Sequence, residues 1–165
     1  MAKRSWILVL AAVLAAPALA LDKGDALPPL VLPTADGTPL DLASLRGQVV
    51  LVDFWASWCG PCRESFPWFA EMHDKLAARG LRIVAISLDE ERKDADRFLA
   101  MHPAPFTVLF DGAAVSGPLF ALPAMPSSYL VGRDGIVRAR HAGFRAKDRD
   151  ALAAEIEAAL AEPEP

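Results

Sequence analysis

The chain has 165 residues, a formal net charge of −4 and only two cysteines. This length is enough for one domain with a complete hydrophobic core. The mildly acidic balance argues against nucleic acid as a partner, and a single close pair of cysteines argues against a scaffold held together by several disulfides.

The first twenty residues have the layout of a cleaved secretory signal. Two basic residues precede the apolar run Trp6–Ala16, and the small-residue site Ala18-Leu19-Ala20 follows it. We therefore expect a signal peptide over 1–20 and a single domain over 21–165 that is soluble in the periplasm after cleavage. The alternative is an uncleaved N-terminal anchor, although the apolar run is shorter than the roughly 20 residues that a membrane span needs.

The chain after the signal begins with a segment rich in Pro and Gly, Asp22–Leu45, in which Asp36-Gly37 marks a tight turn between two short apolar runs. The largely β-branched run Val49–Phe54 has the pattern of a strand buried on both faces. A helical pattern follows and ends at Gly80, and Leu81–Ser87 is predicted to be a second buried strand.

The second half of the chain continues this alternation. Its predicted elements are, in chain order, a surface helix over 89–102, a strand over 106–110, a short helix or irregular turn over 113–122, a β-hairpin with strands at 128–131 and 136–140, and a last helix over 147–161. Strands that alternate with helices, and then a closing hairpin and helix, predict an α/β fold with a central mixed β-sheet flanked by helices.

Cys59 and Cys62 lie two residues apart in the run Trp58-Cys59-Gly60-Pro61-Cys62. A disulfide between them closes a loop of about four residues, for which the chain-entropy estimate is only roughly 2 kcal/mol. Such a bond stabilises the fold little, so we interpret the pair as a redox disulfide that is made and broken.

The position of the pair between a strand and a helix suggests different roles for the two thiols. Cys59 is expected at the helix N-terminus, where unpaired N–H groups and the helix dipole favour a nucleophilic thiolate. Cys62 lies one turn inside the helix and is expected to act second. Pro61 suits the first helical turn, and Gly60 leaves room for the backbone of a partner.

Two other uses of this cysteine spacing fit the sequence poorly. A structural zinc site needs four ligands, but there are only two cysteines, and the histidines at 73, 102 and 141 are scattered. Covalent haem needs His directly after the second cysteine, where this chain has Arg63. We therefore expect no metal and no other cofactor.

Asp53 is the second informative residue, because it lies within an apolar strand six positions before Cys59. Burial raises the pKa of a carboxyl group, and a carboxyl near neutrality can take the proton of Cys62 as that thiol attacks a mixed disulfide. The alternative, which position alone leaves open, is an Asp at the end of a strand that serves only its own hydrogen bonds.

The run Val52–Arg63 resembles the active-site run of thioredoxins. The export signal, the lead-in over 24–50 and the helix-strand insertion over 89–110 are similar to those of the TlpA/ResA-type exported thiol-disulfide oxidoreductases in the redoxin/thioredoxin superfamily. The resemblance covers residues 24–160. It implies a thioredoxin fold with an N-terminal β-hairpin extension, and it favours Asp53 as the base for Cys62.

The resemblance also implies a cis-proline loop facing the cysteines. The matching stretch begins at Met125-Pro126, so Pro126 is the expected cis residue, with Pro123 as a competitor, and the backbone of Met125 would bind a substrate strand. Trp58 would flank the site as an apolar platform for partner chains. Gly60 and Pro61 complete the predicted substrate-binding set.

Two positions depart from the family pattern. Many ResA-like members carry Glu three residues after the second cysteine, where this chain has Ser65. That difference weakens an assignment to cytochrome c maturation. Several members carry Asn where this chain has Asp53, so proton handling here is expected to be closer to that of ordinary thioredoxin.

The sequence and the resemblance together predict a monomeric periplasmic enzyme that reduces protein disulfides. The resemblance implies that its electrons come from a membrane thiol transporter. The dipeptide Gly60-Pro61 is that of thioredoxin and favours reduction. The alternatives are a dithiol oxidase, a copper-binding or copper-assembly module, for which two soft thiolates suit Cu(I), and a thiol peroxidase, which Ala56 disfavours because peroxidatic sites carry Thr or Ser there. Roles in cytochrome c maturation and antioxidant defence stay open.

Overall fold

The computed structural model describes residues 21–164, so the predicted signal peptide lies outside the described residues. Within them, one five-stranded sheet forms the centre, with strand order β5-β4-β3-β6-β7. The bounds of its strands are β3 Val49–Trp55, β4 Leu81–Ser87, β5 Thr107–Phe110, β6 Ser127–Val131 and β7 Val137–Ala142. The first three run parallel, whereas β6 and β7 are antiparallel to their neighbours, so the predicted mixed sheet is confirmed.

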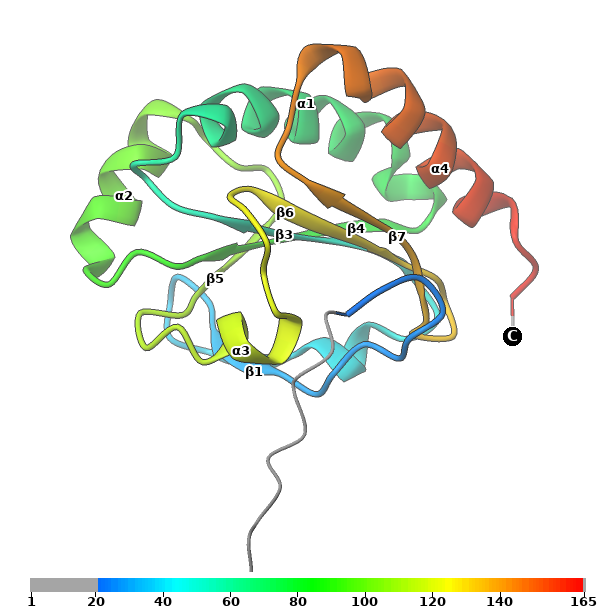
Figure 1. Cartoon of the computed structure of the whole chain (residues 1–165), viewed down its shortest axis with the longest axis horizontal. Helices are drawn as coiled ribbons and strands as arrows, with labels where there is room; N and C mark the ends of the chain where they lie inside the picture. Colours follow the sequence, from blue (N-terminus) through cyan, green and yellow to red (C-terminus); the bar gives the residue numbers. More distant parts are fainter. Residues whose placement is uncertain (1–20, 165) are drawn as a thin grey trace, which may run out of the picture.

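Three helices cover one face of the sheet, as Figure 1 shows. They are α1 Gly60–Leu76, α2 Arg92–Met101 and α4 Arg149–Ala161. The odd-numbered residues of β3 point to this face, where Leu51 and Trp55 join a core with Phe66 of α1 and Ile156 of α4. This alternation of side chains along β3 also places Asp53 on the helical face.

The opposite face is covered by the N-terminal lead-in and by α3 Ser116–Phe120 (Figure 1). The lead-in contains the predicted hairpin, with strands β1 Val31–Pro33 and β2 Pro39–Asp41. It crosses the sheet from one edge to the other, since Ala26 bridges to Ile136 beside β7 and Thr34 bridges to Leu109 of β5. Short 3-10 helices complete the chain at Leu42–Leu45, Ala77–Arg79 and Ala146–Asp148.

The predicted helix over 89–102 is shorter in the structure and begins at Arg92. The helix begins later than predicted because Asp89 is buried and its carboxylate accepts hydrogen bonds from Ser57 and Ser87. The remaining elements agree with their predicted positions to within three residues, including the helix 113–122, which is observed over Ser116–Phe120.

The C-terminal end of α4 is fixed to the turn between β6 and β7 by one arginine. The Arg133 guanidinium donates to the carbonyl oxygens of Ala159 at 3.3 Å, Leu160 at 3.2 Å and Glu162 at 2.9 Å. These are among the last carbonyls of a helix, which have no partner within the helix and favour a cation. Arg133 therefore fixes the C-terminal end of α4 over the sheet together with Arg138 of β7, whose guanidinium pairs with the Glu162 carboxylate at 2.7 Å.

Arg133→Met should lower the free energy of unfolding by about 1–3 kcal/mol, because three carbonyl groups lose a charged donor. Arg133→Lys should lie between this variant and the wild type, since one ammonium cannot reach all three oxygens. Urea denaturation followed by circular dichroism measures both, with substitution of the exposed Lys147 by Met as control. Wild-type stability in Arg133→Met would contradict the assignment.

Candidate active site

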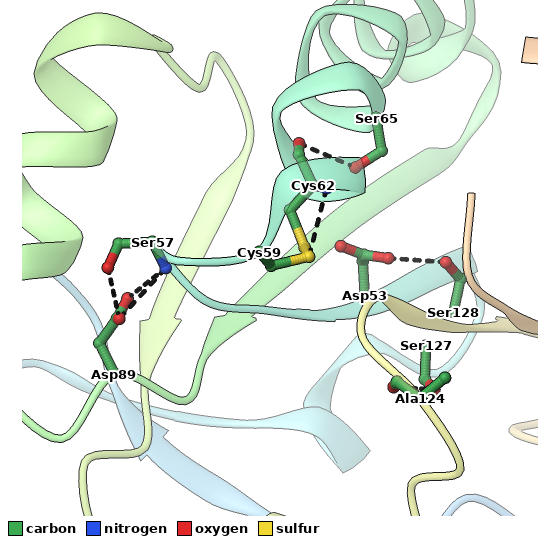
Figure 2. Close-up of a disulfide and its surroundings, with 9 residues drawn as sticks. All are labelled: Asp53, Ser57, Cys59, Cys62, Ser65, Asp89, Ala124, Ser127 and Ser128. Atoms are coloured by element: carbon green, nitrogen blue, oxygen red, sulfur yellow. Dashed lines mark hydrogen bonds between the residues drawn. A yellow bond between two sulfur atoms is a disulfide. The ribbon is translucent and has the colours of Figure 1, made fainter. Parts of the chain in front are cut away.

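The two cysteines lie where β3 ends and α1 begins, and they form a disulfide of 2.05 Å (Figure 2). Cys59 is the N-cap residue of α1, and its sulfur accepts a hydrogen bond from the backbone N–H of Cys62 at 3.3 Å. No acidic residue stands in the first turn of the helix. The helix N-terminus therefore offers unpaired donors and a positive dipole end to a thiolate at Cys59.

The sulfur atoms are well covered in the disulfide form. Cys59 is 3% exposed and Cys62 is fully buried. Ser65, at the position where many ResA-like sequences have Glu, is also buried and donates to the carbonyl oxygen of Cys62 at 3.1 Å. The position three residues after Cys62 thus carries a buried hydroxyl group in place of a carboxylate.

The Asp53 side chain is fully buried beside the disulfide. Its Oδ1 shares a hydrogen bond of 2.6 Å with the hydroxyl of Ser128, and its Oδ2 has no partner. In Figure 2, one carboxyl oxygen points toward Ser128 and the other toward the sulfur atoms. Burial raises the pKa of Asp53 to about 8, against the opposing effect of the Ser128 hydrogen bond.

A second buried aspartate, which the sequence did not indicate, holds the loop before Cys59. The Asp89 carboxylate accepts from the Ser57 amide at 2.9 and 3.1 Å, from the Ser57 hydroxyl at 2.7 Å, and from the Ser87 hydroxyl at 3.0 Å. Asp89 comes two positions after the last residue of β4, just as Ser57 comes two positions after the last residue of β3, so it joins the ends of two neighbouring strands. The available sequence signal was Ser-x-Asp at the end of a buried strand.

The predicted substrate-binding residues lie at the same end of the sheet as the disulfide. The Met125–Pro126 peptide bond is cis, as predicted, and it precedes β6, where Ser127 is opposite Phe54 of β3. Trp58 is 68% exposed. A Cβ atom added to Gly60 would meet no atom within 4 Å, so the space above this residue is open.

Within residues 21–164, no three His, Cys, Asp or Glu side chains are grouped so that they could hold a metal ion. His73 and His102 lie in or beside helices, whereas His141 forms a 2.6 Å ion pair with Glu155 of α4. The helices of this described part include none that is long and apolar enough to cross a membrane.

Asp53→Asn should stabilise the disulfide form in a pH-dependent way. Asp53 ionises near 3.8 when unfolded but near 8 when folded. Between these values the unfolded state releases a proton that the folded state keeps, so the aspartate lowers stability progressively as pH rises. The gain in unfolding free energy should grow from near zero at pH 4 to roughly 3–5 kcal/mol at pH 9. Urea titrations across this range measure it, and a gain that is constant with pH would contradict the assigned pKa.

Asp89→Asn should loosen the loop before Cys59. The amide of Asn has only one oxygen to accept from Ser57 and Ser87, and its NH₂ group would face the remaining donors. We therefore expect the unfolding free energy to fall by about 1–3 kcal/mol. Hydrogen exchange at the Ser57 amide should become faster. Substitution of the exposed neighbour Glu90 by Gln is the matched control, and equal exchange at Ser57 in both variants would refute the role of Asp89.

Comparison with known proteins places these features in context. Residues 22–157 match the protein family described as Redoxin. The chain is 28% identical to the thiol-disulfide oxidoreductase ResA of Bacillus cereus over 127 residues, which cover 76% of this chain and 73% of that protein. It is 34% identical to the thiol:disulfide interchange protein DsbE of Yersinia pestis over 109 residues, covering 65% of this chain and 56% of that protein.

Solved structures agree with these relatives. A crystal structure of a candidate thiol:disulfide interchange protein DsbE from Chlorobium tepidum shares 48% identity with the chain, with a TM-score of 0.83, and the match covers 86% of this chain and 99% of that one. A solution structure of a candidate thioredoxin from Neisseria meningitidis shares 25% identity with the chain, with a TM-score of 0.72. The match covers 84% of this chain and 91% of that one.

Proposed function

The chain belongs to the redoxin family and is a thiol-disulfide oxidoreductase of the ResA and DsbE type, and on this premise we propose that it reduces disulfides of exported proteins in the periplasm. The observation that carries the proposal is the disulfide at the N-terminus of α1, with the partnerless carboxyl oxygen of Asp53 on its inner side. Its substrates are disulfide-bearing proteins.

Reduction begins with the Cys59 thiolate, which the helix N-terminus stabilises. This thiolate attacks one sulfur of the substrate disulfide, and the other substrate sulfur leaves as a thiolate. A mixed disulfide between Cys59 and the substrate results. Trp58, the open space above Gly60 and the backbone at Met125-Pro126 provide the surface on which the substrate chain lies.

The second step resolves the mixed disulfide. The Cys62 thiol gives its proton to the carboxylate of Asp53 and attacks the sulfur of Cys59, which releases the second substrate thiolate. The two substrate thiolates take protons from solvent, and two electrons have passed from the dithiol to the substrate. A carboxyl with a pKa of about 8 suits this transfer, because its affinity for a proton is close to that of a thiol.

The oxidised enzyme then needs a source of electrons outside the cytosol. We propose a membrane thiol transporter as the donor and a monomer as the working form. The signal peptide over 1–20 and the domain over 21–165 belong to the same proposal, and N-terminal sequencing of exported protein tests it: an N-terminus at Leu21 supports cleavage, whereas a retained Met1 supports the anchored alternative.

Substitution of each cysteine separates the two steps. Cys59→Ser should abolish insulin reduction in the presence of dithiothreitol, since the attacking thiolate is lost. Cys62→Ser should accumulate mixed disulfides with insulin chains, which non-reducing electrophoresis and mass spectrometry detect. Unchanged turnover in both variants would refute the mechanism. A wild-type enzyme that oxidises a dithiol peptide faster than it reduces the matching disulfide would instead identify a dithiol oxidase.

A further inference from the structure

The buried Asp53 stands at the inner end of a row of polar side chains that crosses three strands. In the sheet, Asp53 of β3 is opposite Ser128 of β6, and Ser128 is opposite His141 of β7. Directly opposite residues of antiparallel strands point to the same face. The row therefore lies on the helical face of the sheet, where α4 adds Glu155 beside His141.

The contacts along this row lead from the interior to the surface. The Ser128 hydroxyl is 2.6 Å from Oδ1 of Asp53, and Nε2 of His141 is 2.6 Å from a carboxylate oxygen of Glu155. Asp53 is 0% and Ser128 2% exposed, whereas the side chains of His141 and Glu155 are 26% and 42% exposed. Exposure thus rises in the order of the row.

A cavity of about 280 Å³ joins the middle of the row to its outer end. Its lining includes both Ser128 and His141, and its charged members include Arg145 and Asp148. A water molecule needs only about 10–15 Å³ of such volume together with polar partners. The cavity has both, so water can bridge the Ser128 hydroxyl and the imidazole of His141.

On its other side, Asp53 has apolar neighbours. Its partner in β4 is Ala85, and the partner of Ala85 in β5 is Val108. Within residues 21–164, the Asp53 side chain has one hydrogen-bond partner, the Ser128 hydroxyl. Apart from Cys62, the polar group that can receive a proton from Asp53 therefore lies on the side of β6 and β7. A proton that leaves Asp53 for solvent must take this direction.

We propose that Ser128 and His141 form the path through which Asp53 exchanges its proton with solvent, an inference that rests on the role of Asp53 in the proposed function. The carboxylic acid gives its proton to Oγ of Ser128 while the hydroxyl proton of Ser128 passes to water in the cavity. From there a proton passes to His141, which exchanges it with bulk solvent. The hydroxyl is restored, a carboxylate remains at Asp53, and no electrons move. Return of a proton follows the same bonds in reverse.

The groups that face His141 decide where the proton goes next. Glu155 of α4 contacts Nε2 at 2.6 Å, while Arg145 and Asp148 pair with each other at 2.7 Å on the cavity wall. The Arg140 side chain points to the opposite face of the sheet, where its guanidinium donates to the Leu21 carbonyl. The outer end thus contains one titratable imidazole, one carboxylate that contacts it, and a paired guanidinium and carboxylate. Through such a path Asp53 can exchange its proton with solvent after each substrate is reduced and before the enzyme itself is reduced again.

The path is tested by the rate at which Asp53 exchanges its proton, measured in the oxidised full-length enzyme. The side-chain ¹³Cγ signal of Asp53, assigned by its loss in Asp53→Asn, is followed by NMR from pH 5 to 10. The wild type should give one line that moves with pH. Ser128→Ala should show broadening or two lines near the midpoint, from an exchange rate roughly tenfold or more below that of the wild type. Ser128→Thr keeps the hydroxyl and should restore the single line.

Two further variants define the controls. Ser127→Ala removes a neighbouring hydroxyl that donates to the Ala124 carbonyl and has no contact with Asp53, so its line should match the wild type. His141→Ala should broaden the line, and added imidazole should sharpen it again, because this small base fits the opened cavity. A single moving line in Ser128→Ala, or a broadened line in Ser128→Thr, would overturn the path.

Insulin reduction by the same variants separates this inference from the proposed function. If Asp53→Asn reduces insulin as fast as the wild type, the role of Asp53 in resolving the mixed disulfide fails. If Asp53→Asn is slow but the Asp53 signal of Ser128→Ala moves as in the wild type, that role stands and the path alone is wrong. Thermal unfolding of each variant establishes that it is folded.

Discussion

The candidate site depends on the burial of one carboxyl group that has a single hydrogen-bond partner. Asp53 lies among apolar side chains on the helical face of β3, and only the Ser128 hydroxyl compensates its removal from water. Its ionised form is therefore costly, and its proton is held to a pH at which thiols also titrate. A surface aspartate would keep its pKa near the ordinary value of about 4, so the proposed transfer of a proton from Cys62 depends on this burial.

Asp53 and Asp89 show how the same residue type takes two roles at one end of a sheet. Asp89 accepts hydrogen bonds from Ser57 and Ser87 and serves to hold the loop. Asp53 has an oxygen without any partner, on the side of the disulfide. Both side chains are buried, so the number of donors around each carboxylate distinguishes the acid that holds the loop from the acid for which we propose a role in proton transfer.

Much of this arrangement could be predicted from the sequence. The strand β3, the N-terminal position of Cys59 and the burial of Asp53 followed from an apolar run that leads directly into a helical pattern, and the cis bond at Pro126 followed from family resemblance. Contacts between distant segments could not be predicted in this way. Asp89 looked like the first residue of a surface helix. Ser128 becomes a neighbour of Asp53, and His141 a neighbour of Ser128, only through the pairing of β3, β6 and β7.

The contact between Asp89 and Ser57 ties the loop before Cys59 to the order in which the chain folds. The two residues are 32 positions apart, so the loop before Cys59 gains its anchor only after β4 has paired beside β3. Until then, the Asp89 carboxylate does not hold the Ser57 amide and hydroxyl. The backbone that leads into the cysteine pair thus acquires its geometry together with the sheet, and not from its own short stretch of sequence alone.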